Sequence, residues 1–368
     1  MASAIPQGEL AEIVREARAR TGVPAVAAGL LVDGDVELAA DGARVDTPFR
    51  VASITKWFTA SLAGASGVLD ARTRALLSHT ADLRSEAPEA LPDACRGLWS
   101  YSNAGYWAAG DACATAAGSS FSDAMRARIL EPLGLTATSF EEPADAAEGH
   151  VQEGQTGHRA AGLVDYPVSR RPSGGLWSTV GDLLRFAEHQ FGDPHGLQQP
   201  QAKALGAEYC LGCWRRELEG DRIAFEHEGS VGGYQSLLLL VPEERAALVV
   251  LTNSWRGSGL IRRVAKALGL VPASDSLFLS STGPIEPGRY RLGGAEAVVE
   301  EVGDGWRVGE AETDPLTDTR IERGPYAVEP IGGGVYGFAG GLLMGHRIDF
   351  PRPGIARVGW VAMPRAEP

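Results

Sequence analysis

The segment YQSLLLLVPEERAALVVLTNS, residues 234–254, limits the possible folds of this chain more than any other stretch. Two runs rich in Leu and Val flank the residues PEER, and this pattern predicts a β-hairpin. Neither run alternates between apolar and polar residues, so both faces of the sheet that contains the hairpin should be buried. We therefore expect other elements to cover this sheet on both sides.

Segments both before and after the hairpin in the sequence are predicted to form strands that extend the sheet and helices that cover it. Residues 23–42 are typical of two strands joined by a turn at Asp33–Gly34. Residues 8–20 place apolar side chains at helical intervals, with charges on the other face. The other predicted helices span residues 54–65, 104–117, 120–131, 179–191 and 259–269. This order predicts an α+β fold (an α/β sandwich), in which helices flank an antiparallel sheet and a helical subdomain is attached.

The C-terminal part of the chain has a different pattern. Residues 271–288 are rich in Pro, Ser and Gly, which is typical of a connector. Short alternating runs follow, with turns such as Asp304–Gly305 and the glycines 332–334, and they predict a small β-barrel or sandwich. We expect a main domain over residues 1–272, a linker over 273–288 and a C-terminal domain over 289–368, because 368 residues exceed what one core usually supports.

Charge and hydropathy exclude several classes of partner. The formal net charge of −13 argues against binding to a nucleic-acid backbone, which needs clustered Lys and Arg. No apolar run reaches the roughly 18 residues of a membrane span, and the N-terminus lacks a basic stretch followed by an apolar one. We expect a cytoplasmic protein that acts on a small molecule, without nucleic-acid or membrane partners and with its oligomeric state open.

The cysteines raise the question of a redox or metal site. Cys210 and Cys213 form a C-x-x-C pair, a spacing found in redox pairs and in half of some zinc sites. A second ligand pair at matching spacing is missing from the sequence. The flanking residues are typical of a strand, where a thiol behaves as a small buried hydrophobe. No metal site and no cofactor are therefore expected.

Catalytic chemistry is first indicated by Ser53 and Lys56 in FRVASITKWF, residues 49–58. A serine hydroxyl is a poor nucleophile until a base removes its proton, and a lysine held neutral by burial can act as that base. A helix is predicted to begin near Ser53, so these two side chains would share one face. Positive potential at the helix N-terminus favours a serine alkoxide over a charged lysine. On this pair alone, an ordinary solvated helix lysine remains the alternative.

Two further motifs carry residues suited to the same chemistry. WSYSNAGYW contains Tyr101 and Asn103 in a loop that enters a helix, and a phenol beside a lysine can carry a proton between nucleophile and leaving group. FEHEGSVGGYQS places His227 and Gly229 on a predicted strand. Glycine there lets a substrate carbonyl approach the strand edge and accept a backbone N–H. Each motif by itself is more often structural.

Together and in this order, the three motifs resemble those of the serine β-lactamase and penicillin-binding-protein superfamily, in particular its class C β-lactamase and esterase branch. Flanking segments such as LLSHTADL, ILEPLGLTATSF and PSGGLWSTVGDLLRF strengthen the resemblance, which spans about residues 8–270. It implies an acyl-enzyme mechanism. The C-terminal domain resembles the lipocalin-like barrels appended to some family members.

The resemblance implies a role for each motif residue. Ser53 would attack an ester, amide or lactam carbonyl, and Lys56 and Tyr101 would share the base and acid roles. Asn103 would orient the lysine and the substrate. The other implied substrate contacts are the oxyanion-hole N–H groups of Ser53 and Ser230, together with His227, Gly229, Gly174, Gly175 and Trp177.

Two departures from the family pattern disfavour a dedicated β-lactamase. The segment between Lys56 and LLSHT is much shorter than usual, which could open the cleft on one side. His227 stands where β-lactamases usually carry Lys, and a neutral imidazole is a poor partner for the carboxylate of a penicillin.

Three functions fit these observations. The leading expectation is a serine hydrolase of esterase type that acts on a small ester or amide through an acyl–Ser53 intermediate. The alternative is an acyltransferase that passes the acyl group to an amine or alcohol in secondary-metabolite biosynthesis. A non-catalytic ligand-binding module is the third, disfavoured because the Ser, Lys and Tyr are all present. Exclusion of water decides between the first two, and Trp57, Trp107 and Trp177 fit either a dry cleft or ordinary core packing.

Overall fold

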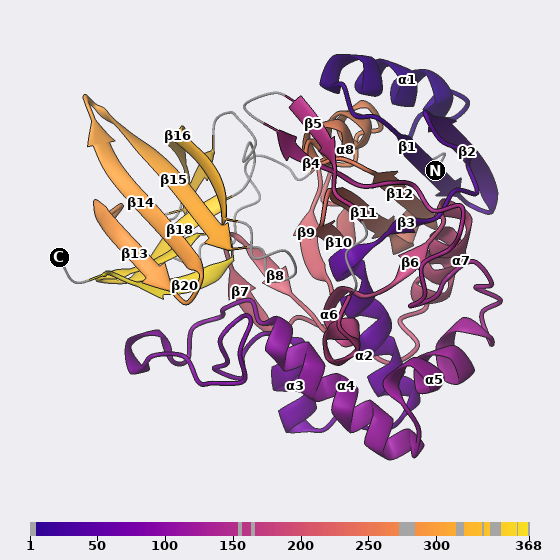
Figure 1. Ribbon diagram of the computed structural model, residues 1–368, viewed down its shortest axis with the longest axis horizontal. Helices are drawn as coiled ribbons and strands as arrows, with labels where there is room; N and C mark the ends of the chain where they lie inside the picture. The colour runs from indigo at the N-terminus through magenta and orange to yellow at the C-terminus, as the bar shows by residue number, and fades with distance from the viewer. Residues whose placement is uncertain are drawn as a thin grey trace. The chain divides into compact units, whose positions relative to one another are not determined.

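The computed structural model describes residues 5–153, 157–162, 166–271, 284–313, 320–332, 335–338, 347–358 and 360–366 (Figure 1). The chain divides into two compact units. The first comprises Met1–Thr73, Tyr106–Gln199 and Cys210–Ala273, and the second comprises Arg74–Gly105, Pro200–Tyr209 and Ser274–Pro368. The predicted linker over 273–288 lies largely outside the described residues, so the predicted domain bounds stay a prediction.

The core of the first unit is an antiparallel sheet that contains the predicted hairpin. Six strands follow the order β2-β1-β12-β11-β10-β9. Their bounds are Val26–Val32 (β1), Asp35–Asp41 (β2), Trp214–Glu217 (β9), Ile223–Val231 (β10), Tyr234–Val241 (β11) and Ala246–Thr252 (β12). Val241 pairs with Ala246 where the hairpin turns, which confirms the two strands expected around PEER.

Helices cover both faces of this sheet, as its apolar strands require (Figure 1). α1 (Leu10–Thr21) and α8 (Gly257–Ala267) share one apolar cluster with β1, β11 and β12. On the other face, α7 (Val180–Gln190) lies so close to β1 that a Cβ at Gly29 would come within 2.8 Å of the Leu184 side chain. Every residue of β12 is consequently buried.

Local sequence explains where two of these helices begin and end. α1 ends at Gly22, which adopts a left-handed φ of 68° and donates its N–H to the carbonyl of Arg18, a conformation that glycine adopts without strain. α7 follows Thr179, whose hydroxyl accepts the N–H of Asp182 at 3.3 Å. Such a cap satisfies one of the unpaired donors at the start of a helix.

The helix that carries Lys56, α2 (Thr55–Ala65), packs against α7. The ring of Phe58 stacks on that of Phe186 with 3.8 Å between centroids, and Trp57 meets the same ring edge-on. Trp57 is fully buried, so this tryptophan belongs to the core.

The other elements of the first unit are short. They are β3 (Phe49–Arg50), η1 (Ala52–Ile54), α5 (Phe121–Met125), a π-helical turn at Arg126–Leu130, β4 (His150–Glu153), β5 (Gly157–Ala160), η4 (Val168–Arg170), α6 (Arg171–Gly174), β6 (Trp177–Ser178) and η5 (Pro242–Glu244). Two helices, α3 (Ala71–Leu77) and α4 (Asn103–Ala117), include residues of both units.

A nearly closed eight-stranded barrel forms the C-terminal part of the second unit, as the alternating pattern predicts. Each strand from β13 to β20 pairs antiparallel with the next, and a bridge between Tyr290 and Arg365 links the first strand region to the last. Tyr290, Ile348 and Phe350 are buried in its core. The strands are Gly288–Leu292 (β13), Ala295–Val302 (β14), Gly305–Thr313 (β15), Arg320–Gly332 (β16), Val335–Phe338 (β17), Arg347–Arg352 (β18), Ile355–Val358 (β19) and Val361–Pro364 (β20). The same unit holds η2 (Asp93–Cys95) and the hairpin of β7 (Ala202–Ala204) and β8 (Ala207–Tyr209).

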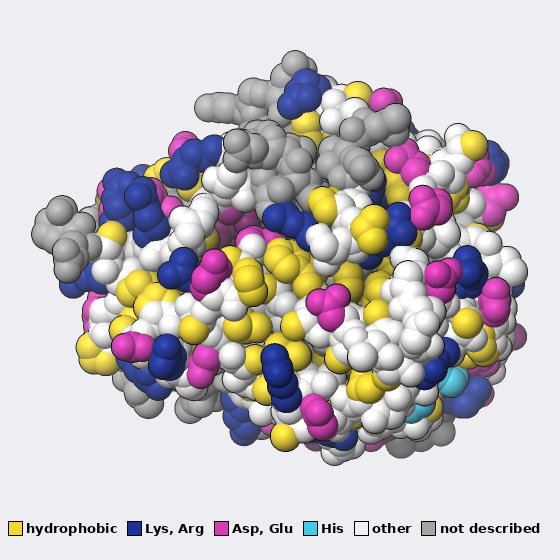
Figure 2. Space-filling model, turned by 60° about the horizontal axis from the view of Figure 1, so that its bottom comes forward, with side chains coloured by type: hydrophobic (Ala, Val, Ile, Leu, Met, Phe, Trp, Pro, Cys, Tyr) yellow, Lys and Arg dark blue, Asp and Glu magenta, His cyan; other side chains and the backbone are white. Residues whose placement is uncertain are grey.

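The remaining general features concern thiols, metals and charge. All four cysteines are buried thiols, and burial raises the pKa of Cys213. Within the described ranges, no group of His, Cys, Asp and Glu could hold a metal ion, and no described helix is long and apolar enough to cross a bilayer. Among the described side chains on the face drawn in Figure 2, acidic and basic groups are interspersed, so this face offers no extended basic surface.

Candidate active site

Ser53 lies in a strained turn between β3 and α2. The preceding residue, Ala52, has a φ of 48°, a left-handed conformation that costs energy for any residue with a Cβ. Two hydrogen bonds to Val51 hold this turn: its N–H donates to the Leu176 carbonyl at 3.0 Å, and its carbonyl accepts from the Ser236 hydroxyl at 2.8 Å. The backbone that leads into the turn is therefore held in place just before the nucleophile.

Lys56 is fully buried and faces Ser53 from the first turn of α2. Its Nζ lies 3.1 Å from Oγ of Ser53 and donates to the carbonyl of Ser173 at 2.6 Å. The ring of Tyr106 is 5.3 Å from the same nitrogen, within reach of a cation–π interaction. This geometry allows a proton to pass directly between Ser53 and Lys56.

A short segment after residue 170 fixes the far side of Lys56. The Thr59 hydroxyl donates to the Pro172 carbonyl at 2.8 Å, and Nε1 of Trp107 donates to Oγ of Ser173 at 2.9 Å. The Ser173 carbonyl is thus held at a defined position beside the lysine amine. Sequence reasoning did not single out Ser173, although PSGGLWSTVGDLLRF was among the family-like segments, because its contact is made by a backbone oxygen.

Gly229 on β10 is required for the close approach of the nucleophile turn. A Cβ at this position would lie 2.3 Å from the Val51 carbonyl oxygen and 2.3 Å from Oγ of Ser236. No side chain larger than hydrogen fits there without moving the turn. One residue further on, Ser230 is exposed, and its hydroxyl accepts from Nε2 of Gln235 at 2.7 Å.

His227 is fully buried on the same strand. Burial lowers its pKa to about 3. Its Nδ1 lies 2.6 Å from the carbonyl of Glu228. The imidazole is consequently neutral at physiological pH and presents no positive charge to a ligand.

The depressed pKa of His227 predicts a pH dependence of stability. As pH falls below about 6.5, the unfolded chain takes up a proton that the folded chain binds only near pH 3, so folding stability is present above pH 6.5 and is lost toward pH 3. The slope is up to about 1.4 kcal/mol per pH unit. In His227→Gln, urea unfolding between pH 4 and 6.5 should vary less with pH than in the native chain. Between pH 7 and 9 the free energies of unfolding of the two proteins should differ by a constant amount. If the free energy of unfolding of His227→Gln fell with acid as steeply as that of the native chain, the assignment would be contradicted.

Trp177, the predicted substrate contact on β6, has a side chain only 1% exposed. The guanidinium of Arg50 lies 4.5 Å from its ring centroid, and Tyr234 meets the ring edge-on at 5.7 Å. Nearby, a Cβ at Gly174 would lie 2.6 Å from the Tyr166 hydroxyl, and one at Gly175 would lie 2.9 Å from Cα of Arg171. These glycines allow close chain packing, and their contact with substrate stays a prediction.

Tyr101 and Asn103 belong to the second unit. Tyr101 is 7% exposed, donates its N–H to the carbonyl of Trp360 at 2.9 Å, and lies 4.3 Å from the His79 ring. Asn103 begins α4, and its Nδ2 donates to Oε1 of Glu86. The structure therefore brings together Ser53, Lys56, His227 and Gly229 in the first unit, while Tyr101 and Asn103 share the second.

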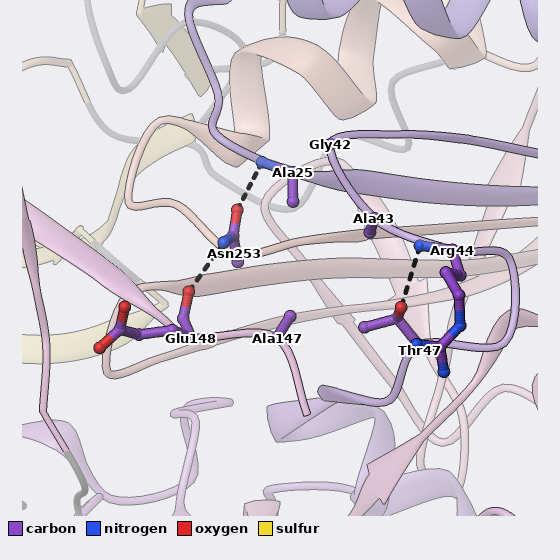
Figure 3. A pocket seen from close by; sticks show the side chains of 8 residues that line it. All are labelled: Ala25, Gly42, Ala43, Arg44, Thr47, Ala147, Glu148 and Asn253. Carbon is purple, nitrogen blue, oxygen red and sulfur yellow. Dashed lines mark hydrogen bonds between the residues drawn. The ribbon is translucent and has the colours of Figure 1, made fainter. Parts of the chain in front are cut away.

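A separate cavity of about 500 Å³ lies in the first unit. Figure 3 shows its lining, in which Asn253 accepts the N–H of Ala25 and donates to the carbonyl of Glu148, each at 2.7 Å. The full lining is Ala25, Gly42, Ala43, Arg44, Thr47, Ala147, Glu148 and Asn253. None of the predicted site residues contributes to it.

Comparison with known proteins places these features in a family context. The family model described as Beta-lactamase matches residues 65–270, a stretch that begins downstream of Ser53 and Lys56. Penicillin-binding protein 4 of Amycolatopsis lactamdurans is 27% identical over 309 residues, covering 63% of this chain and 81% of that protein. Among solved structures, SurE matches with a TM-score of 0.73 at 22% identity, covering 97% of this chain and 98% of its own. A D-stereospecific amidohydrolase from Streptomyces matches with a TM-score of 0.63 at 20% identity, covering 72% and 98%.

Proposed function

Since the chain belongs to the beta-lactamase family, we propose that it is a serine hydrolase that cleaves a small ester or amide through an acyl–Ser53 intermediate. One observation carries the proposal: Nζ of a fully buried lysine lies 3.1 Å from Oγ of Ser53. Removal of an amine from water disfavours its charged form, and a neutral amine at this distance can accept the serine proton.

In the proposed reaction, Oγ of Ser53 attacks the carbonyl carbon while its proton passes to Lys56 or Tyr101. The N–H groups of Ser53 and Ser230 stabilise the oxyanion. As the bond to the alcohol or amine breaks, the leaving group receives a proton from the same residues and the acyl group stays on Ser53. Water then attacks this ester, which releases the acid and restores the serine hydroxyl.

We propose that the substrate carries no carboxylate next to the reacting carbonyl, and that its acyl part is a D-amino acid residue. The first point is supported by the neutral, buried His227, which offers no cation to such a carboxylate. The second is supported by the similarity to SurE, which has been solved with D-Leu, and to the D-stereospecific amidohydrolase.

Transfer of the acyl group to an amine is a second candidate. An amine would attack the same acyl–Ser53 intermediate that water attacks in hydrolysis. The solved structure of SurE with D-Leu supports this candidate to the extent that an amino acid carries an amine, the type of group that replaces water in such a transfer. In this reaction the amine attacks acyl–Ser53 and forms an amide instead of an acid.

The proposal predicts covalent labelling of Ser53. Intact-mass analysis after exposure to a fluorophosphonate should show one adduct in the native chain and none in Ser53→Ala. The matched control, Ser119→Ala, removes an exposed hydroxyl and should label like the native chain. Absence of an adduct in the native chain, or an adduct that persists in Ser53→Ala, would contradict the acyl-serine mechanism.

The substrate class is tested with the p-nitrophenyl esters of N-acetyl-D-leucine and N-acetyl-L-leucine. The D ester should react at least about tenfold faster, a difference of about 1.4 kcal/mol in the activation free energy. Equal rates would contradict the D preference without affecting the labelling result. Added D-leucine methyl ester should yield an amide if transfer operates, and only N-acetyl-leucine if hydrolysis does.

A further inference from the structure

The C-terminal barrel holds the segment that carries Tyr101, and it does so at three successive residues. Nη1 of Arg357 on β19 donates to the carbonyl of Trp99 at 3.2 Å, and the N–H of Ala362 on β20 donates to Oγ of Ser100 at 3.2 Å. The N–H of Tyr101 donates to the carbonyl of Trp360 at 2.9 Å. All of these contacts lie within the second unit, so the hairpin of β19 and β20 holds residues 99–101, at Trp99 and Tyr101 through the backbone and at Ser100 through the side chain.

Arg357 is itself held rigidly inside the second unit. Its Nε and Nη2 donate to the two carboxylate oxygens of Asp349 at 2.8 and 2.6 Å, and both side chains are at most 3% exposed. A bidentate pair fixes the plane of the guanidinium, so the remaining Nη1 can point at the Trp99 carbonyl. A buried ion pair costs desolvation energy, and here it places a donor at a defined point of the Tyr101 segment.

Trp360 contributes both backbone and ring to this contact. It lies in the turn between β19 and β20 with a φ of 71°, a conformation that is strained for a bulky residue. In this conformation the Trp360 carbonyl accepts the N–H of Tyr101. The centroids of the Trp360 and Tyr101 rings are 5.5 Å apart. The His79 ring is 4.3 Å from the same phenol ring, and Nε2 of His79 is 3.1 Å from the Tyr209 hydroxyl. The aromatic ring of Tyr101 therefore packs among groups that are themselves anchored.

We propose that the β19–β20 hairpin is a positioning element for Tyr101, and that Trp360 is a positioning residue of the acylation reaction. This inference rests on the proposed function, in which Tyr101 exchanges a proton with the nucleophile and the leaving group. Displacement of a catalytic group by about 1 Å can cost about 100-fold in rate. The barrel is thus part of the catalytic apparatus, and its loss would impair acylation even with Ser53 and Lys56 in place.

The proposal predicts the behaviour of Trp360→Gly. Glycine adopts the left-handed φ without strain and keeps the carbonyl that binds Tyr101, so the turn should form while the ring is lost. We expect the rate of fluorophosphonate labelling at Ser53 to fall about 10–100-fold. Trp360→Phe, which keeps an aromatic ring and the same strained backbone, should stay within about threefold of the native rate. Trp306→Phe, elsewhere in the barrel, is the control and should label like the native chain; circular dichroism checks folding of each variant.

A double-mutant cycle with Tyr101→Phe separates positioning from general loosening of the fold. If Trp360 acts through the Tyr101 hydroxyl, Trp360→Gly should add less than about a twofold loss in the Tyr101→Phe background. An equal loss in both backgrounds would overturn the inference. Native labelling that is unchanged in Trp360→Gly would also overturn it and leave the proposed function intact. Absence of labelling in the native chain would instead reject the proposed function, together with the inference built on it.

Discussion

Lys56→Met is expected to lower the rate of Ser53 acylation by a factor of about 10²–10⁴. Methionine is an unbranched side chain that adapts to buried sites, so it replaces the stem of Lys56 while removing the amine 3.1 Å from Oγ. Without that amine, the serine proton loses the acceptor that lies 3.1 Å from Oγ. The rate is measured by intact mass over time with a fluorophosphonate and with an activated ester.

The matched control for this prediction is Lys266→Met, which changes an exposed lysine on α8 and should leave the labelling rate within about twofold of the native value. A Lys56→Met protein that acylates at the native rate would show that another group is the base.

Gly229→Ala is expected to lower the free energy of unfolding by about 3 kcal/mol, at the upper end of the usual cost of overpacking. The added methyl group would lie 2.3 Å from the Val51 carbonyl oxygen and from Oγ of Ser236, and these two atoms are hydrogen-bonded to each other. Neither can move without disturbing the strained turn at Ala52. Acylation should therefore slow as well, because the turn that presents Ser53 is displaced.

Gly181→Ala is the matched control, and urea unfolding measures the free energy of unfolding of both variants. Gly181 lies in the first turn of α7, and a Cβ there would meet no atom within 4 Å. Its replacement should leave the free energy of unfolding unchanged or raise it by up to about 1 kcal/mol, since alanine favours helices over glycine. Equal stability of the two variants would mean that β10 and the nucleophile turn can separate at little cost.

The sequence predictions agree best with the structure for elements that a local sequence pattern specifies. The hairpin around PEER, α7 and the barrel strands follow from periodicity and turn residues, because backbone preferences and side-chain alternation act over a few positions. The pair Ser53 and Lys56 follows in the same way from a spacing of three on a helix. Whether that lysine was solvated or buried could not be read from the spacing, and its burial came from the packing of distant segments.

Other features of the site depend on residues far apart in the chain. The Ser173 carbonyl lies 117 positions from Lys56, and Arg357 lies 258 positions from Trp99. Gly229 was predicted for substrate access, and the structure adds that it makes room for the turn before Ser53. Backbone carbonyls and close approaches leave no side-chain pattern in a sequence, so such contacts cannot be inferred from it.

The amino-acid sequence by itself therefore determined the central hairpin, the longer helices, the strands of the barrel and the residue types capable of acyl transfer. The tertiary structure decided which of those residues are buried, which atoms face Lys56, and how the barrel holds the Tyr101 segment. The physical reason is range: hydrogen-bonding and hydrophobic periodicity act between near neighbours, whereas desolvation and packing depend on what the whole chain brings together.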